Sequence, residues 1–428
     1  MNYNVTNYSS GRTSDIQNAL FATFQGRSAK PDIFIGQEFL SSAGVTNWKS
    51  AMNTASGSSG TYSSAAFIDG PDTDSALIYR SDKVVLDRTV VVATGGNSPL
   101  PPRNILRYDM HLAGYGTSTT FSVYSSHMKA GTTSDDMARR LLEAQIIRDD
   151  AQTLGHPFIS GGDYNIQSSN ETSFSELTGS QTNNLGRFFD PIKTSGTWNN
   201  SSTYRFVHTQ DPWSGGAGMD DRFDFVLLSS ALIDGQGLDY IGNPNVSYST
   251  TTWNDPNHSY RSWGNDGTSF NTPLTVTNNA MVGPVIAQAL INATGNGSGH
   301  LPVFLDLKVP AKVSVPSSIN FGTLQLGQSA SVQLTVTNSA NTSLWTAPGI
   351  DALTYSMTAT LGISVPGGTF NAPAGGFINH TVSLNTSFAG PKQGVITVSS
   401  DDPDNPVVSI PVSAYVLPFR TTGGNHID

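Results

Sequence analysis

The sequence contains no cysteine. This absence excludes disulfide bonds, thiolate catalysis and cysteine-ligated zinc. Cations that prefer oxygen ligands, such as Mg²⁺, Mn²⁺ or Ca²⁺, remain compatible with the composition. The sequence also lacks any apolar run of about 18 residues, so we expect no membrane-spanning helix.

Charge is scarce, because charged residues make up only 13% of the chain and the net charge is −10. Residues 1–310 carry 19 basic and 27 acidic residues, and residues 311–428 carry 3 and 5. Neither part has the basic character of a stable nucleic-acid-binding module. An enzyme that only visits a phosphodiester is still compatible with this charge, since a bound metal supplies local positive charge.

The length of 428 residues suits two domains, and the composition changes after Pro310. Residues 311–417 contain no glutamate and show alternating runs at 332–337, 380–384, 395–398 and 407–416. Short, regularly spaced strands of this kind predict an all-β sandwich. We therefore expect a first domain over 1–310, a β-sandwich over 311–417 and a polar tail over 418–428.

The pattern in residues 1–310 predicts many strands and few helices. Helices are expected at 13–24 and 134–154, the second capped by Ser134. Short apolar runs predict strands at 33–35, 76–79, 84–86, 90–93, 121–125, 158–159, 223–228 and 303–309. This order indicates two sheets packed face to face and flanked by helices, in the α/β or α+β class.

Seven short motifs occur in fixed order at or near the ends of these apolar runs. They are Tyr3–Val5, Gly36–Glu38, Arg103, Ser126–Lys129, Gly162–Asn165, Arg222–Phe225 and Ser298–Val303. Loops that leave a rigid sheet are where polar side chains converge on one cleft. No single motif is specific, so the prediction depends on the whole series.

The residue types in the series suit hydrolysis of a phosphoester, which needs a cation, a base and an acid. We expect Glu38 and Asn4 to supply oxygen ligands to a metal. Asp163 and Asn165 point the same way if the chain is extended there, so that they position water and phosphate. The alternative for Gly162–Asn165 is an Asx-turn.

The remaining candidates are imidazoles and cations. Asp224 and His300 form a candidate carboxylate–imidazole pair. His127 is a candidate catalytic residue at the end of its own strand. Three basic side chains are candidates for substrate binding, namely Arg103, Lys129 and Arg222.

The order and spacing of these motifs resemble the endonuclease/exonuclease/phosphatase superfamily, the deoxyribonuclease-I-like fold, over nearly all of residues 1–310. The resemblance implies a four-layer α/β sandwich. It also implies roles for Asn4 and Glu38 at the metal, Arg103 and His127 at the phosphate, Asp163 and Asn165 as a pair that positions water and phosphate, and Asp224 as the partner of His300.

The last motif departs from the family pattern Ser-Asp-His-x-Pro-Val, because Gly299 stands where the family has aspartate. Loss of this carboxylate predicts weaker metal binding, which Gly299→Asp would restore. The alternative is that Asp266 or Asp221 fills the place.

Residues 314–416 resemble a Hydin-like, choice-of-anchor immunoglobulin-type module of secreted and surface bacterial proteins. The matching stretches are 319–322, 334–338 and 397–403. This resemblance implies a spacer or interaction domain that contacts a surface or a polymer.

The sequence therefore predicts a secreted phosphodiesterase that depends on Mg²⁺ or Mn²⁺, an endonuclease on DNA or RNA, with nucleic acid as substrate and not as a stable partner. A phosphatase or phospholipase C-type enzyme of the same superfamily is one alternative, and a catalytically impaired adhesion or binding protein is another. No signal peptide is visible in this chain. Aromatic residues in 236–297 either line the cleft or form a small core of their own.

Overall fold

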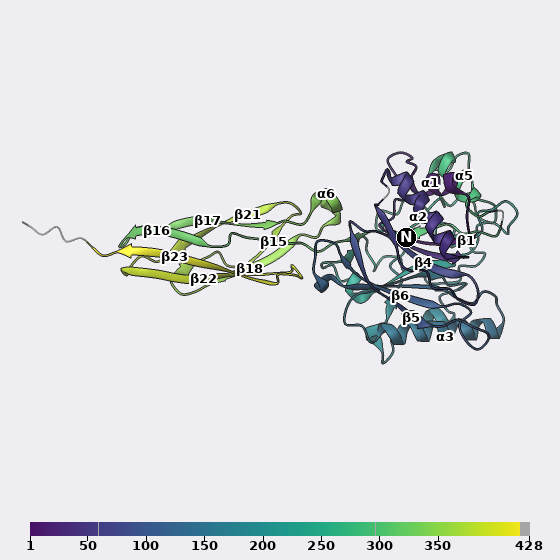
Figure 1. Ribbon diagram of the computed structural model, residues 1–428, viewed down its shortest axis with the longest axis horizontal. Helices are drawn as coiled ribbons and strands as arrows, with labels where there is room; N and C mark the ends of the chain where they lie inside the picture. The colour runs from purple at the N-terminus through teal and green to yellow at the C-terminus, as the bar shows by residue number, and fades with distance from the viewer. Residues whose placement is uncertain (59, 296, 420–428) are drawn as a thin grey trace, which may run out of the picture. The chain divides into compact units, whose positions relative to one another are not determined.

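The computed structural model describes residues 1–58, 60–295 and 297–419, so most of the predicted tail lies outside the described residues. The chain divides into two compact units (Figure 1). The first comprises residues 1–235 and 239–307, and the second comprises residues 236–238 and 308–428.

The first sheet of the first unit has six strands. Their order is β12 (Arg261–Ser262), β13 (Val303–Phe304), β1 (Asn2–Tyr8), β2 (Ile33–Phe39), β4 (Asp74–Arg80) and β3 (Tyr62–Ser64). β1 and β2 are parallel, and the other neighbours are antiparallel.

The second sheet also has six strands. Their order is β5 (Val84–Ala93), β6 (Ile105–Leu112), β7 (Phe121–His127), β8 (Phe158–Asp163), β10 (Asp224–Ser229) and β9 (Phe188–Phe189). Here β7 and β8 form the parallel pair, and the other neighbours are antiparallel. Each sheet therefore has one parallel pair among its inner strands.

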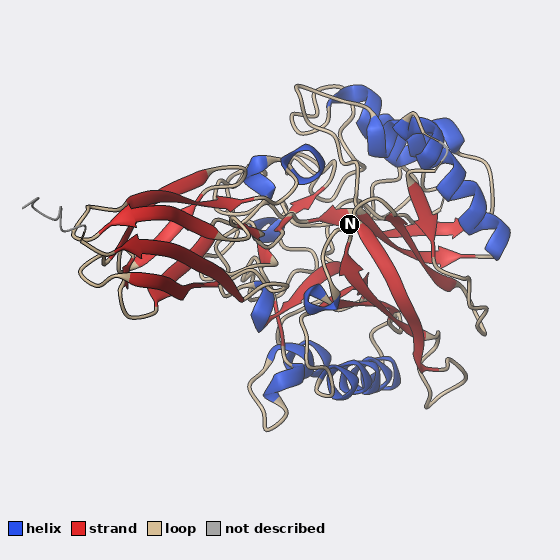
Figure 2. Ribbon diagram, turned by 60° about the vertical axis from the view of Figure 1, so that its left-hand side comes forward, coloured by secondary structure: helices blue, strands red, loops and turns tan. Residues whose placement is uncertain are grey.

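Helices cover the outer face of each sheet (Figure 2). On the first sheet lie α1 (Thr13–Phe21) and α2 (Ser42–Ser56), and Ile16, Leu20 and Trp48 pack in one core with Tyr3 and Phe34. On the second lie α3 (Ser134–Ala151) and α4 (Thr172–Thr178), whose apolar side chains pack with strands β6, β7, β8 and β10. A further helix, α5 (Gly283–Asn292), packs beside α1. The mixed α/β class predicted for this part is confirmed.

The inner faces of the two sheets meet through polar as well as apolar side chains. Gln37 of β2 is fully buried and donates from Nε2 to Asn2 Oδ1 at 2.8 Å and to Ser125 Oγ at 3.3 Å. Ser125 belongs to β7, so this hydrogen bond joins the two sheets. The two sheets approach closely at Gly161 of β8, where a Cβ atom would lie 2.7 Å from Ile35 Cδ1 and would require that side chain to shift.

The start of α3 shows how local sequence fixes a helix end. Thr133 Oγ1 accepts from the backbone N–H of Asp136, and the Asp136 carboxylate accepts from the backbone N–H of Thr133. This reciprocal capping box satisfies two backbone donors at the helix start. The expected helix over 134–154 is present but ends at Ala151, and its cap is Thr133 and not Ser134.

The first unit also contains short elements outside the two sheets. They are η1 (Thr117–Thr119), η2 (Asn184–Gly186), η3 (Ser202–Tyr204), η4 (Ser230–Leu232) and β11 (Asp239–Tyr240), while β14 (Leu307–Lys308) spans the boundary at residue 307. The expected single strand over 303–309 is therefore two short strands, β13 and β14.

The second unit contains two sheets with one core between them. The four-stranded sheet has the order β15 (Val313–Ser314), β17 (Ser331–Asn338), β21 (Phe377–Leu384), β19 (Ile363–Ser364). The five-stranded sheet has the order β16 (Ile319–Gln325), β23 (Val407–Leu417), β22 (Gly390–Ser400), β18 (Leu353–Ala359), β20 (Thr369–Ala372). Two short helical turns, α6 (Thr342–Trp345) and η5 (Ala347–Gly349), complete the unit. Among the described residues, no helix is long and apolar enough to span a bilayer.

Candidate active site

The candidate site lies where equivalent ends of the central strands meet. Glu38, His127 and Asp163 lie at the carboxyl ends of β2, β7 and β8, and Asn4 lies within β1 at the point where its regular pairing with β2 stops. β10 and β13 run antiparallel to their neighbours, so the beginnings of these strands lie at the same edges. Those beginnings bring in Asp224 and His300, which lies three residues before Val303.

Glu38 turns toward the site because β2 is irregular there. Its pairing with β4 shifts register between Gly36 and Phe39, and Glu38 has a left-handed φ of 65°. Such backbone costs about 1 kcal/mol or more for a residue that has a side chain. Glu38 Oε2 accepts from the backbone N–H of Asn7 at 2.9 Å. A strand irregularity therefore aims this carboxylate, as bulges near active sites often do.

Asn4 lies between the two nearest carboxylates. Its Nδ2 donates to Glu38 Oε1 at 2.9 Å and to Asp163 Oδ2 at 3.0 Å, and its Oδ1 accepts from the backbone N–H of Thr6 at 3.0 Å. One lone pair of the Asn4 oxygen is therefore used by the backbone, and a role for this oxygen at a metal stays a prediction. The Nδ2 group donates to both carboxylates and holds them next to each other.

Glu38, His127 and Asp163 form the only group of three or more acidic or histidine side chains in the described residues whose ligand atoms all lie within 4.8 Å. His127 Nε2 lies 3.3 Å from Asp163 Oδ2, and its Nδ1 lies 3.9 Å from Glu38 Oε1. Burial lowers the pKa of His127 well below its ordinary value, and the charges of Arg103 and His300 lower it further. The neutral ring therefore has a lone pair to offer.

These three residues fit a divalent cation. The Nδ1 atom of His127 is buried without a hydrogen-bond partner in the part of the chain that the structure describes. A buried nitrogen of this kind is costly unless something binds it. Two carboxylates and one imidazole suit Mn²⁺, and the carboxylates also suit Mg²⁺. The candidate metal ligands are therefore Glu38, His127 and Asp163.

His300 forms the expected pair with Asp224. Its Nδ1 lies 2.8 Å from Asp224 Oδ2, and Asp224 is fully buried. On the other side of the ring, His300 Nε2 lies 3.5 Å from Asp163 Oδ2. Burial alone would lower the pKa of His300, but the charges of Asp224 and Asp163 raise it to about 10. The neighbouring carboxylates therefore favour the positively charged imidazole, which can attract an anion.

Asp163 and Asn165 adopt the turn that the sequence left as an alternative. The backbone N–H of Asn165 donates to Asp163 Oδ1 at 3.2 Å, which is an Asx-turn, and Asn165 has a left-handed φ of 54°. Asn165 Nδ2 donates to Met128 O at 3.1 Å, so this side chain holds the segment that follows His127. Burial raises the pKa of Asp163 above its ordinary range, and the charges of Asp224 and Glu38 add to the rise.

Arg222 is not placed at the site, contrary to expectation. Its guanidinium is fully buried and donates to both carboxylate oxygens of Asp190 at 2.9 Å and to Thr194 Oγ1. It also lies over the rings of Trp198 and Phe225, at 5.0 and 4.5 Å from their centroids. A cation enclosed in this way cannot reach a substrate, so Arg222 has a structural role.

The other two cations are held by acidic partners. Lys129 Nζ lies 2.8 Å from Asp136 Oδ1 at the start of α3. Arg103 donates to Thr73 Oγ1 at 3.0 Å and pairs with Asp72 at 2.8 Å. Arg103 is nevertheless close enough for its charge to lower the pKa of His127. Of the three predicted phosphate-binding cations, only Arg103 therefore lies near the candidate site.

Most of the aromatic side chains in 236–297 are buried. Tyr240, Tyr248, Tyr260 and Trp263 are all at most 3% exposed, which favours the small-core interpretation.

Neither candidate for the missing carboxylate is free. Asp266 accepts from Thr268 and Ala280, and Asp221 accepts from Asn199 Nδ2 at 2.8 Å.

Gly299 itself leaves no room for the family side chain. A Cβ atom there would lie closer than 3.0 Å to Cβ and Cγ2 of Thr294, which is buried. The backbone N–H of Gly299 donates to Asp211 Oδ1 at 3.1 Å. The glycine is therefore fitted to its surroundings, and the expected gain from Gly299→Asp does not follow from this geometry.

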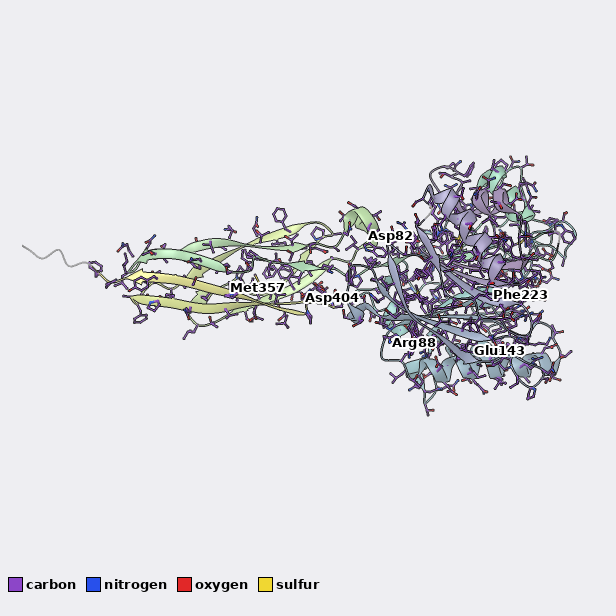
Figure 3. The ribbon with its side chains drawn as sticks, in the orientation of Figure 1. Asp82, Arg88, Glu143, Phe223, Met357 and Asp404 are labelled. Atoms are coloured by element: carbon purple, nitrogen blue, oxygen red, sulfur yellow. The ribbon has the colours of Figure 1, made fainter. Side chains whose placement is uncertain are left out.

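Two residues near the site were missed from the sequence. Gln210 Nε2 lies 3.3 Å from His300 Nε2 and 3.1 Å from Ser298 Oγ. Glu143 of α3 is fully buried, and its Oε2 accepts from the backbone N–H of Lys129 at 3.0 Å (Figure 3). The burial of Glu143 has a sequence signal, since it shares the spacing of Arg140, Ala144 and other buried residues of α3. Gln210 has none, because the side chains that it contacts, Ser298 and His300, are distant in sequence.

No family model matches the sequence, and no curated protein sequence matches it. Several solved structures align with part of the chain at low identity, and two of them are described as endonuclease/exonuclease/phosphatase family proteins. One is a member of that family from Bacteroides thetaiotaomicron, at 17% identity, covering 59% of this chain and 86% of that chain with a TM-score of 0.39. The human nocturnin catalytic domain with bound sulfate has 14% identity, 56% and 83% coverage and a TM-score of 0.38. The Bacteroides thetaiotaomicron mannosyl-6-phosphatase has 15% identity, 72% and 97% coverage and a TM-score of 0.38.

Proposed function

We propose that the chain is a divalent-metal-dependent phosphoester hydrolase that cleaves phosphodiesters, with DNA or RNA as substrate. The observation that carries the proposal is the meeting of Glu38, His127 and Asp163 with the Asp224–His300 pair at one edge of the two sheets. Two carboxylates, a neutral imidazole and a charged imidazole within a few ångströms are groups that phosphoester hydrolysis uses.

The division of roles follows from the geometry. Glu38, His127 and Asp163 would hold the cation, which when bound supplies positive charge to the phosphoryl oxygens and lowers the pKa of bound water. Asp224 fixes the His300 ring through Nδ1, and the charges of the neighbouring carboxylates favour a proton on Nε2 as well. The charged ring attracts a phosphoryl oxygen and can donate that proton to the leaving oxygen. Asn4 keeps Glu38 and Asp163 apart by a shared amide.

The test is a substrate panel with metal variation. Plasmid DNA, RNA, sphingomyelin and inositol phosphates are each incubated with Mg²⁺, Mn²⁺, Ca²⁺ or EDTA. We expect cleavage of nucleic acid that EDTA abolishes. Turnover of sphingomyelin or inositol phosphates alone would support a phospholipase C-type or phosphatase activity, and no turnover of any substrate would support a binding protein.

A pair of variants distinguishes the activity of this site from that of a contaminating enzyme. His300→Asn should lower kcat at least about 100-fold, the usual scale for loss of an acid–base group. His111→Asn is the matched control, because His111 pairs with Asp87 at 2.8 Å on β6, in a pair of side chains away from the site. Full activity in His300→Asn would show that the Asp224–His300 pair does not act in the reaction.

We further propose that the protein acts outside the cell, since its lack of cysteine and its low charge are common in secreted proteins. We propose limits of 1–310 for the catalytic domain and 311–417 for an immunoglobulin-like sandwich. We propose that the sandwich contacts a surface or polymer.

A further inference from the structure

Gln210 lies on a rigid piece of backbone beside the site. It forms an isolated bridge with Asp221 on one side and with His300 on the other. The neighbouring Thr209 O accepts from the backbone N–H of Leu301 at 2.7 Å. Segments that pair on both sides have little freedom to shift, so the position of the Gln210 side chain is set by the fold.

The side chain of Gln210 reaches the face of His300 that is turned to the site. Its Nε2 lies 3.3 Å from His300 Nε2, the ring atom opposite the one that pairs with Asp224. Gln210 is partly exposed, whereas His300 is 4% exposed. Of these two side chains, Gln210 therefore meets an entering ligand first.

The residue before His300 adds no side chain to the site. Residue 299 is glycine, its N–H is bound to Asp211, and a Cβ atom would overlap Thr294. Position 299 thus contributes no side chain beside His300. The side chain that lies next to the His300 ring comes from the neighbouring 209–210 segment.

The chemistry of an amide suits a position beside His300. Glu38, Asp163 and Asp224 already put three carboxylates around the site, and an anionic phosphoester is repelled by each further negative charge. An amide N–H is a hydrogen-bond donor without charge and can contact an anionic oxygen. It adds binding without raising the repulsion.

We propose that Gln210 contacts the substrate, donating its side-chain amide N–H to the phosphoryl oxygen that also contacts His300 Nε2. This inference rests on the proposed phosphoester hydrolase. It assigns to Gln210 the recognition of the phosphoryl group, a role that no motif of the sequence indicated.

Two variants of the full chain test the proposal. Gln210→Glu keeps the shape of the side chain and introduces a charge, and Gln210→Met keeps its length and removes the donor. Gln288→Glu on the exposed side of α5 is the matched control for the added charge. Binding of inorganic phosphate is measured by calorimetry with and without Mn²⁺, and hydrolysis of bis(4-nitrophenyl) phosphate gives kcat and KM.

We expect Gln210→Met to weaken phosphate binding and lower kcat/KM by roughly 10- to 100-fold, the range for a lost hydrogen bond to a charged group. Gln210→Glu should bind phosphate more weakly still. Lowering the ionic strength should increase the difference in phosphate affinity between this variant and the wild type. Thermal midpoints of all variants should stay near that of the wild type, and Gln288→Glu should behave as wild type.

Wild-type phosphate affinity in Gln210→Glu would overturn the proposal, and so would a wild-type chain that binds no phosphate. A wild-type chain that binds phosphate through Gln210 but hydrolyses no phosphoester would uphold the contact and refute the proposed function. The two failures are thus distinguishable.

Discussion

Glu143 makes the stability of the first unit depend on pH in a direction opposite to that of an ordinary paired carboxylate. Burial raises the pKa of the Glu143 carboxyl to about 8, although the charges of Arg103, Arg139 and Arg140 and the hydrogen bond from the Lys129 backbone oppose the rise. Its second oxygen, Oε1, has no hydrogen-bond partner among the described residues. The substitution Glu143→Gln replaces the carboxyl with an uncharged group of the same shape.

The sign follows from proton binding in the two states. Below about pH 4.5 the carboxyl is protonated in both states, so its contribution to stability is fully present. As the pH rises toward 8, the unfolded chain releases the proton while the folded chain keeps it, and the free energy of unfolding falls. The slope is about 1.4 kcal/mol per pH unit, and the interval from 4.5 to about 8 amounts to on the order of 5 kcal/mol.

The assay is urea denaturation of wild type and Glu143→Gln between pH 5.5 and pH 7.5. Tryptophan fluorescence reports mainly on the first unit, which holds five of the six tryptophans. The advantage of the variant over wild type should grow by about 3 kcal/mol across this range. Glu176→Gln, on the partly exposed surface of α4, is the matched control. A difference between Glu143→Gln and wild type that stays constant with pH would refute the reasoning.

Two further substitutions test the packing around the site. Gly299→Asp should destabilise the chain by about 1–3 kcal/mol through overlap with Thr294, and Thr294→Gly in the same chain should recover part of the loss, as measured by thermal unfolding. A fully stable single variant would show that Thr294 moves aside. Arg222→Met should cost about 3–5 kcal/mol in urea denaturation, because it leaves Asp190 buried without its partner. Adding Asp190→Asn should restore part of that loss, and a double variant no better than the single one would contradict the pairing argument.

The sequence predicted best what depends on short-range pattern. Strand ends carrying Glu38, His127 and Asp163 were identified because an apolar run stops there, and α3 because its cap and apolar spacing are local. α2 was missed although Val45, Trp48 and Met52 have helical spacing, since polar residues fill the rest of the segment.

The errors concern side chains whose partners lie far along the chain. Arg222 looked like a substrate ligand because nothing near it in sequence reveals Asp190. Gln210 joins the site only through the bridge to His300. Pairings of this kind exist only once the sheets are assembled.

The polar contacts between the two sheets have a consequence for the site, which takes Asn4 and Glu38 from one sheet and His127, Asp163 and Asp224 from the other. The hydrophobic effect is non-directional, so an interface made only of apolar side chains would allow one sheet to slide over the other. The hydrogen bond from Gln37 to Ser125 has a preferred length and angle. It fixes the register of the two layers one residue before Glu38 and two residues before His127, and so constrains the distance between side chains that the opposite sheets bring to the site.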